Sequence, residues 1–260
     1  MWYNYIGKKE KIMNIIIFDT ETIGKVNQDL INIGYKIIDL DISNGSFKTL
    51  QERDYLITRF INNKDYCLND DFVGAQKYGL WLNALENKKA VKRTLKQVFK
   101  TLENDIKKFK VLCGYAYNCK FDVDKFMKNG FEFNIPIFDI WGYASKAIIN
   151  TDDYYKWAIE NNQLTESERY ISSTVESVTR YLNNDLNFKE SHIALDDVQY
   201  ETQILVECFK RGVDITKTAP TPKRIESKKV FTKTIKYGDV EMDISYTKSY
   251  ERNGTIIYKW

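Results

Sequence analysis

The hydrophobic pattern of the first 60 residues predicts three consecutive strands. Residues 14–19 are a short apolar run that ends at polar residues, which is typical of a buried strand. Residues 31–42 and 46–60 contain further strand-like stretches, and the turn signal Asn44-Gly45 separates them. Together these segments predict a three-stranded meander.

The pattern changes to helical spacing near residue 90. Residues 90–109 place apolar side chains three and four positions apart, with Lys and Glu between them, which predicts an amphipathic helix. Residues 61–90 are less regular. Further strands are predicted at 111–116 and 136–140, and further helices at 121–130, 153–162, 173–184 and 194–211. Strands followed by helices indicate an α/β domain over about residues 1–212.

The C-terminal segment follows a different pattern. Residues 218–222, TAPTP, are typical of a linker, and polar and apolar residues alternate after them with turn signals in between. This alternation predicts a small antiparallel β unit of about three strands. The expected parts of the chain are an N-terminal arm (1–12), a main α/β domain (13–216) and a basic β-rich C-terminal extension (217–260).

The composition is that of an ordinary soluble globular protein, with 43% hydrophobic and 29% charged residues among 260. No apolar run approaches the length of a transmembrane helix, and the N-terminal residues 1–14 lack the pattern of a secretory signal. Translation could start at Met1 or at Met13, which directly precedes the first predicted strand. The four cysteines are too sparse and irregular for a disulfide framework or a structural zinc site. We therefore expect a cytoplasmic protein with no membrane partner.

The net charge of +3 conceals an asymmetry between the two parts of the chain. From Lys217 onward there are ten Lys or Arg against five Asp or Glu, whereas the remainder has 29 against 31. Basic residues such as Lys228 and Lys229 alternate with aromatic residues such as Phe231, a combination that suits a nucleic-acid backbone and its bases. The alternative is a solvated hairpin that packs on the domain or forms a dimer contact.

Two acidic residues follow the first predicted strand directly. Asp19 and Glu21 are two positions apart, so their side chains project to the same side of a strand. Neighbouring carboxylates repel each other unless a cation lies between them, and Mg²⁺ or Mn²⁺ prefers oxygen ligands. The functional interpretation is a metal site at a strand end, and the structural one is a strand that leaves the core into a polar loop.

Two further polar groups occur where later elements begin. Asn118 and Asp122 follow the strand at 111–116, and the only histidine, His192, precedes Asp197 by five positions. Taken singly, each acid is well explained as a group that stabilises the positive end of a helix dipole.

The three groups occur in one α/β domain in a fixed order, as FDTETIG (18–24), NCKFD (118–122) and HIALDD (192–197). This constellation resembles the DEDDh (DnaQ-like) family of 3′→5′ exonucleases over about residues 13–212. The resemblance implies a ribonuclease H-like mixed sheet flanked by helices. One departure is Tyr117, because many members of that family have a histidine before the asparagine of the second motif.

The resemblance also implies a role for each matching residue. Two divalent metal ions, Mg²⁺ or Mn²⁺, would be bound by four acids, and a histidine would be the general base. The metal-binding acids are Asp19, Glu21, Asp122 and Asp197, and the base is His192; the motif spacing selects Asp122 over Asp124 and Asp197 over Asp196. Asp19 would bridge both ions, and the product would be a nucleoside 5′-monophosphate. Candidate substrate-binding residues are Thr20, Thr22, Ile23, Asn118, Lys228 and Lys229, with simple packing as the alternative for Ile23.

The expected substrate is DNA, and a DNA polymerase is the partner that a proofreading or repair role would imply. An exoribonuclease that trims RNA 3′ ends is an alternative, because recognition of the 2′-position decides between the polymers and no residue signals it. A second alternative is a non-catalytic nucleic-acid- or polymerase-binding module that retains the fold. The oligomeric state stays open.

Overall fold

The computed structural model describes residues 12–24, 29–68, 74–227, 230–237, 240–250 and 256–259, with side chains up to Ser227 apart from those of residues 74–76. These residues form two compact units. The first contains the described residues up to Ala144 together with Lys189–Pro220, and the second contains Ser145–Phe188 together with the described residues from Thr221 onward.

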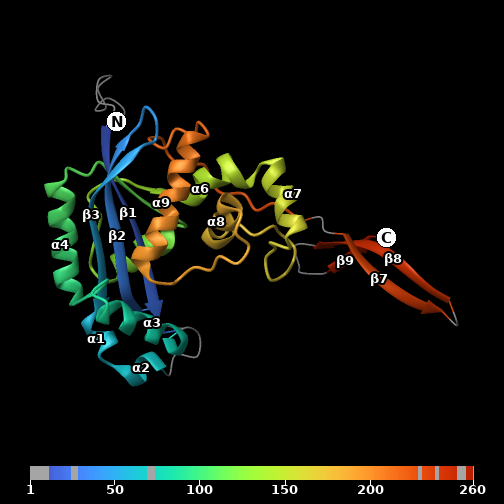
Figure 1. Ribbon diagram of the computed structural model, residues 1–260, viewed down its shortest axis with the longest axis horizontal. Helices are drawn as coiled ribbons and strands as arrows, with labels where there is room; N and C mark the ends of the chain where they lie inside the picture. Colours follow the sequence, from blue (N-terminus) through green and yellow to red (C-terminus); the bar gives the residue numbers. More distant parts are fainter. Residues whose placement is uncertain are drawn as a thin grey trace. The chain divides into compact units, whose positions relative to one another are not determined.

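The first unit is built on a six-stranded mixed sheet with the strand order β4-β3-β2-β1-β5-β6 (Figure 1). Its strands are β1 (Ile12–Ile23), β2 (Asp29–Asp41), β3 (Phe47–Ile57), β4 (Val91–Arg93), β5 (Cys113–Ala116) and β6 (Ile137–Asp139). Strands β1, β2 and β3 form the predicted antiparallel meander, whereas β5 and β6 extend the sheet in parallel with β1. This arrangement is consistent with the expected ribonuclease H-like fold.

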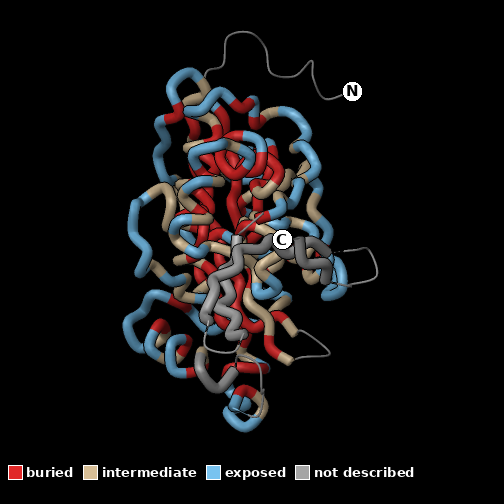
Figure 2. Tube along the Cα trace, turned by 90° about the vertical axis from the view of Figure 1, so that its right-hand side faces the viewer, coloured by how far each residue is buried: buried red, intermediate tan, exposed pale blue. Residues whose placement is uncertain are grey.

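Helices cover both faces of this sheet. The described helices of this unit are α1 (Thr58–Ile61), α2 (Lys64–Leu68), α3 (Gly74–Glu86), α4 (Leu95–Lys108), α5 (Lys120–Lys128), α6 (Ile140–Ala144) and α9 (Ala194–Lys210), of which α1, α2 and α3 lie at one end of the sheet (Figure 1). Alternate residues of β1 point to opposite faces, and Ile16 and Phe18 pack with apolar residues of α4 and α5 in one core. Helix α9 packs against β1 and β2 on the other face (Figure 1). Figure 2 shows the buried strands running through the centre of this unit.

The segment between β3 and α4 is more regular than its sequence indicates. Residues 61–90, which show no clear periodicity, include helices α2 and α3, and Trp81 of α3 is fully buried in the core. The predicted helix at 90–109 begins later, at Leu95, because Thr94 caps it in a capping box with Gln97. Val91, expected on that helix, lies instead in the short strand β4 and is exposed.

The second unit joins two segments that are distant in the sequence. It contains the π-helical turn η1 (Ser145–Ile149), α7 (Asp152–Glu160) and α8 (Val175–Asn183). The amide of Ile171 donates to the carbonyl of Ile225, and the amide of Ser227 donates to that of Arg169. Residues 221–227 therefore fold with residues 145–188. The sequence pattern instead places residues 145–188 in the main domain and residues 221–227 in the C-terminal extension.

The last described residues of this unit form a separate three-stranded antiparallel sheet. Its strands are β7 (Val230–Tyr237), β8 (Val240–Tyr250) and β9 (Ile256–Lys259), in the order β7-β8-β9. Lys228 and Lys229 lie outside the described residues, as does most of the expected N-terminal arm.

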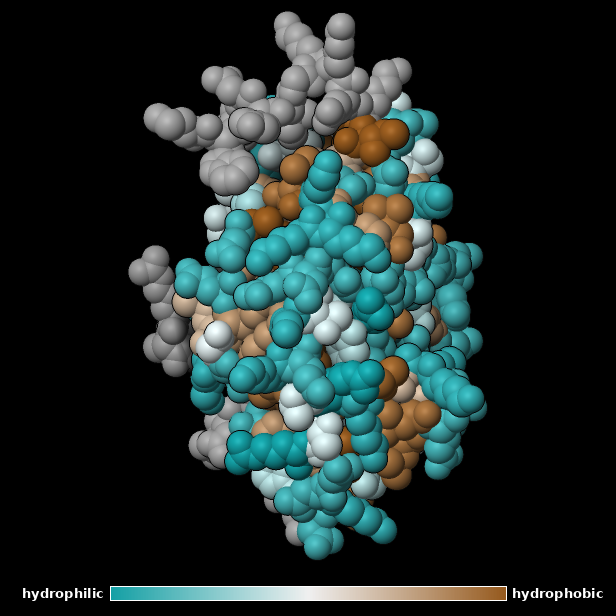
Figure 3. Space-filling model, turned by 90° about the vertical axis from the view of Figure 1, so that its left-hand side faces the viewer, coloured by the Kyte–Doolittle hydropathy of each residue, from teal (hydrophilic) through white to brown (hydrophobic). Residues whose placement is uncertain are grey.

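The surface seen from the left-hand side of Figure 1 is largely hydrophilic, and its apolar residues form separate patches (Figure 3). Within the described part of the chain, no helix has the length and apolar character needed to cross a membrane.

Candidate active site

The two acids at the end of β1 lie opposite Gly34 and Asn32 of β2, the two residues that position helix α9. In the antiparallel register, Asp19 pairs with Gly34 and Glu21 pairs with Asn32, and the register shifts just after Glu21. The shift interrupts the ladder next to Glu21, and the pairing resumes with Thr22 opposite Leu30. Asp19 is half-buried and the side chain of Glu21 is 13% exposed, so both residues keep a small accessible surface at the end of β1.

Gly34 lets α9 approach the sheet beside Asp19. A Cβ atom at position 34 would lie 2.7 Å from the Cα of Leu195 and closer still to its backbone nitrogen, so only glycine leaves room for the first turn of α9. Asn32 fixes the same turn, because its Oδ1 accepts a 2.7 Å hydrogen bond from the amide of Ala194. The side chain of Ile193, the N-cap residue, forms no capping bond, so Asn32 replaces the missing cap.

Helix α9 brings Asp197 to this end of the sheet. Asp197 is 6% exposed, whereas the neighbouring Asp196 is only partly buried. Burial, and then the charge of Glu21, raise the pKa of Asp197 to about 8. Its Oδ1 is buried and has no hydrogen-bond partner among the described residues.

Asp122 reaches the site from the first turn of α5. One of its oxygens, Oδ1, accepts hydrogen bonds from the amide (3.0 Å) and the hydroxyl (2.6 Å) of Thr20. Burial raises the pKa of Asp122 to about 7 although these bonds oppose the rise. Asp124, two positions later, is exposed and pairs with Lys120.

The loop that precedes α5 is held by β6. Asn118 adopts a left-handed backbone conformation, with φ of 57°, and its amide donates a 2.9 Å hydrogen bond to Oδ1 of Asp139. The amide of Trp141 donates to the same oxygen. Asp139 at the end of β6 thus fixes the turn from which Asp122 projects.

Glu21 has two basic neighbours. Its Oε2 lies 3.0 Å from Nζ of Lys77, and its Oε1 lies 3.4 Å from Nδ1 of His192. Burial alone would raise the pKa of Glu21, but these two partners together hold it below its ordinary value. Ligand atoms of Glu21, His192 and Asp197 all lie within 4.8 Å of one another, close enough to share one ion.

His192 is the exposed member of the group. Its side chain is 46% exposed, and its backbone is left-handed, with φ of 56°, which is uncommon outside glycine. The hydrogen bond with Glu21 raises the pKa of the imidazole above its ordinary value. His192 is therefore a stronger base here than an unperturbed imidazole.

The site carries more negative charge than the described basic residues balance. Burial, and then the charges of Asp122 and Glu201, raise the pKa of Asp19 well above its ordinary value. Buried carboxylates that lack partners favour either protonation or a bound cation. The donors are oxygen atoms and one imidazole, and two buried oxygens are unpartnered, so these residues fit hard divalent cations such as Mg²⁺ or Mn²⁺.

Sequence motifs did not identify two members of the site. Lys77 comes from α3, in the segment whose sequence lacks a clear pattern. Glu201 lies on α9 one turn after Asp197 and is 3% exposed. An acid on the otherwise apolar stripe of the predicted helix 194–211 is the signal that could have found Glu201. The sequence gives no comparable signal for Lys77.

The candidate substrate-binding residues differ in their surroundings. Thr20 is 5% exposed, and both of its donors are used to hold Asp122. Ile23 is 1% exposed within the core, as simple packing requires. Thr22 is partly exposed and Asn118 is exposed, so both are accessible to a ligand.

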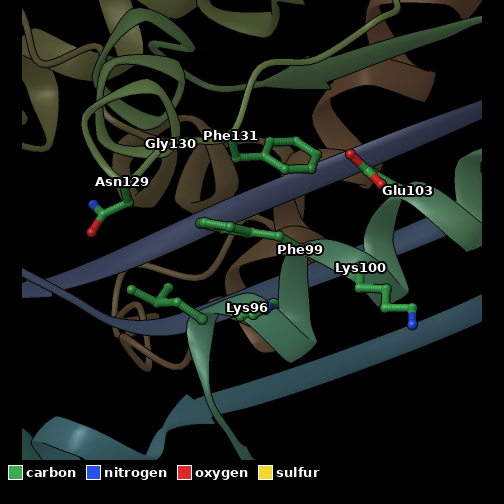
Figure 4. A pocket seen from close by; sticks show the side chains of 8 residues that line it. Lys96, Phe99, Lys100, Glu103, Asn129, Gly130 and Phe131 are labelled. Atoms are coloured by element: carbon green, nitrogen blue, oxygen red, sulfur yellow. The ribbon is translucent and has the colours of Figure 1, made fainter.

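A surface pocket lies elsewhere in the first unit, between α4 and the segment that follows α5 (Figure 4). Its volume is about 380 Å³, and the rings of Phe99 and Phe131 line it 4.9 Å apart between centroids. The pocket includes none of the clustered acids and not His192, so it is separate from the acidic site.

Comparisons with known proteins give structural matches only. No protein-family model matches the chain, and no curated protein matches its sequence significantly. Among solved structures, the chain is similar to the zinc-bound E. coli ExoI–ssDNA complex (13% identity, TM-score 0.42) and to E. coli exonuclease I with a dA16 oligonucleotide (12% identity, TM-score 0.43). Each match covers 74% of this chain and 39% of the other. Over that part, the chain thus has a low-identity structural match to E. coli exonuclease I.

Proposed function

We propose that this protein is a metal-dependent 3′→5′ exonuclease that hydrolyses phosphodiester bonds of DNA and releases nucleoside 5′-monophosphates. One observation carries the proposal. The acids of three distant sequence motifs gather around the end of β1, with the exposed side chain of His192 beside them. Separate structural roles for these motifs would not require them to meet.

The proposed metal-binding residues are the four motif acids, Asp19, Glu21, Asp122 and Asp197. When bound, two Mg²⁺ or Mn²⁺ ions would supply an activated water molecule and would stabilise the leaving 3′-oxygen. The protein contributes a set of carboxylates that is already ordered. Thr20 holds Asp122 in place, and Gly34 with Asn32 places the helix that carries Asp197.

His192 is proposed to accept the proton of the attacking water. Its Nδ1 faces Oε1 of Glu21, so the neutral tautomer with a proton on Nδ1 leaves Nε2 free to accept another. The side chain is exposed enough for water and substrate to reach Nε2. Because Glu21 raises the pKa of this imidazole, we expect the hydrolysis rate to rise with pH through that raised pKa.

The substrate contacts are proposed from accessibility. Thr22 and Asn118 flank the acids and are open to a ligand, so we assign them to the terminal nucleotide. Lys228 and Lys229 are assigned to the phosphate backbone of the strand, on the basis of their charge.

The test uses 5′-labelled DNA and RNA oligonucleotides of one sequence, single-stranded and duplex, with Mg²⁺, Mn²⁺ or EDTA. The proposal predicts a metal-dependent ladder that shortens from the 3′ end, faster on DNA, and that is lost in His192→Ala. Faster cleavage of RNA would make the protein an exoribonuclease. Binding without cleavage of any substrate would indicate the non-catalytic module instead.

A further inference from the structure

Glu201 is a fifth acid of the site, outside the three sequence motifs. It lies on α9 four residues after Asp197, and this spacing places both side chains on one face of the helix. Glu201 is 3% exposed, and its Oε2 is buried with no hydrogen-bond partner among the described residues. A buried carboxylate in this state is costly unless a cation or a proton compensates its charge.

The side chain of Glu201 faces the other acids. The backbone amide of Tyr117, the residue after β5, donates a hydrogen bond to it. The charge of Asp122, after burial itself, is the largest influence that raises its pKa, and the charge of Glu201 in turn acts on Asp19. The side chain of Glu201 therefore extends from α9 toward the backbone of Tyr117 and toward Asp122 on α5.

Other buried acids of the first unit have neutralising or hydrogen-bonding partners. Asp105 accepts from the hydroxyl of Tyr35 at 2.9 Å and pairs with Arg53 at 3.1 Å. Asp54 accepts from the side-chain amide of Asn32 at 2.5 Å. One oxygen of each of these two acids therefore has a bonding partner within the fold.

The buried side-chain carboxylate oxygens that lack a partner in the described chain are Asp197 Oδ1 and Glu201 Oε2. They occur one turn apart on the same helix, on the face turned to the acidic site. A purely structural acid is expected to leave no buried oxygen without a partner, and Asp105 and Asp54 have none among the described residues. The two oxygens without a partner lie one turn apart on the same face of α9, and this arrangement favours a ligand that both residues bind.

We propose that Glu201 contributes a fifth carboxylate to the binding of the divalent cation held by Asp197. This inference rests on the proposed function, and it adds a residue to that site. It also accounts for an acid on the apolar stripe of α9, where an aliphatic residue would pack at lower cost.

The alternative is that Glu201 keeps a proton and acts as a neutral hydrogen-bonding group. Glutamine has nearly the same shape as a protonated glutamic acid and cannot ligate a cation with a charged oxygen. Glu201→Gln therefore separates the two roles. The substitution keeps a neutral hydrogen-bonding group but removes a carboxylate that binds a cation, so only the second role predicts weaker metal binding. Glu207→Gln is the matched control, since Glu207 lies on the same helix but pairs with Arg211.

The experiment measures Mn²⁺ affinity of the full chain by calorimetry and by the loss of the free-ion electron paramagnetic resonance signal. We expect Glu201→Gln to weaken Mn²⁺ binding by at least about 10-fold, because loss of even an outer-shell partner of a metal ligand typically costs about 10- to 100-fold. Glu207→Gln should bind as the wild type does. Asp197→Asn serves as the reference for loss of a motif ligand.

Equal Mn²⁺ affinity of wild type and folded Glu201→Gln would overturn the inference while leaving the proposed function intact. Absence of Mn²⁺ binding in the wild type would instead overturn both. Glu201→Met, which has a similar volume, is a second variant that keeps the test decisive if the glutamine side chain prevents folding, and circular dichroism checks that each variant is folded.

Discussion

The amino group of Lys77 lies 3.0 Å from Oε2 of Glu21, and both side chains are largely buried, at 12% and 13% exposure. This ion pair joins α3, from a segment without clear sequence periodicity, to a motif acid at the end of β1. Lys77 therefore neutralises one of the carboxylates proposed to hold a metal ion. A cation that binds Glu21 must compete with that amino group.

The competition gives the first prediction. Lys77→Met should tighten Mn²⁺ binding in the absence of nucleic acid by roughly threefold to tenfold, the equivalent of about 1 kcal/mol for one ion pair. Calorimetric titration measures it. Lys96→Met on α4, whose side chain is exposed and outside the site, should leave the affinity unchanged. An unchanged affinity in Lys77→Met would mean that Lys77 does not compete for Glu21.

A second prediction concerns stability and pH. Burial raises the pKa of Asp122 to about 7 and that of Asp197 to about 8, so the folded state keeps protons that the unfolded chain releases near pH 4. Between about pH 4 and pH 8 the folded state therefore binds more protons than the unfolded chain. As a result, the free energy of unfolding falls as pH rises through this range. Each such group contributes a slope of up to about 1.4 kcal/mol per pH unit.

Thermal denaturation in EDTA between pH 5.5 and pH 8 measures this effect. We expect the melting temperature of the metal-free wild type to fall with rising pH, and added Mn²⁺ to restore more stability at pH 8 than at pH 5.5. Asp197→Asn should have a shallower pH dependence and should exceed the metal-free wild type in stability at pH 8. A wild-type melting temperature that rises across this range would contradict the raised pKa values.

The close approach of α9 to β2 gives a third prediction. Gly34→Ala places a Cβ atom against the backbone of Leu195, which must move away from the sheet together with Asp197. Overpacking of this kind costs about 1–3 kcal/mol, sometimes more. Urea denaturation should show that loss, and Mn²⁺ affinity should fall as well.

Gly79→Ala is the matched control for that substitution. Gly79 lies within α3 and is exposed, and an added Cβ atom would meet nothing within 4 Å. Because alanine is favoured over glycine inside helices by about 1 kcal/mol, this variant should be as stable as the wild type or more so. Equal effects of the two substitutions would show that no special constraint exists at Gly34.

A fourth prediction concerns the basic C-terminal segment. Replacing Lys228 and Lys229 with alanine should weaken binding to single-stranded DNA and reduce the slope of log affinity against log salt by about 1.4, at roughly 0.7 per phosphate contact. A truncation for the same purpose should end after Ser227, because residues 225 and 227 pair with residues 171 and 169. Full affinity with an unchanged salt slope in the double variant would assign these lysines to the solvated surface.

The sequence predicts the parts of this fold that follow simple periodicity. The run that ends at Asp19 predicts β1, and the spacing of Val98 and Leu102 predicts the buried face of α4. Helix α3 was missed because its apolar residues are not confined to one face: Trp81 is fully buried, whereas the adjacent Leu80 is exposed. Tertiary packing, and not periodicity, therefore defines this helix. Local periodicity predicts regular strands and amphipathic helices, but it does not predict a helix such as α3, whose position at the end of the sheet depends on tertiary packing.

The candidate site shows the same limit. Motif spacing selected Asp122 and Asp197, and the structure buries both, whereas Asp124 is exposed and Asp196 is only partly buried. Thr20 was expected to contact substrate, yet its two donors are used by Asp122, a contact between residues 102 positions apart that no local pattern encodes.

The most direct test of the central claim compares matched acids on the same 5′-labelled single-stranded DNA with Mg²⁺. Asp122→Asn and Asp197→Asn should abolish shortening from the 3′ end, whereas Asp124→Asn and Asp196→Asn, which change neighbouring acids in the same way, should retain it. Nucleoside 5′-monophosphates should accumulate only with the active proteins. Equal cleavage by all four variants, or no cleavage by the wild type, would contradict the assignment of this acidic site to nucleic-acid hydrolysis.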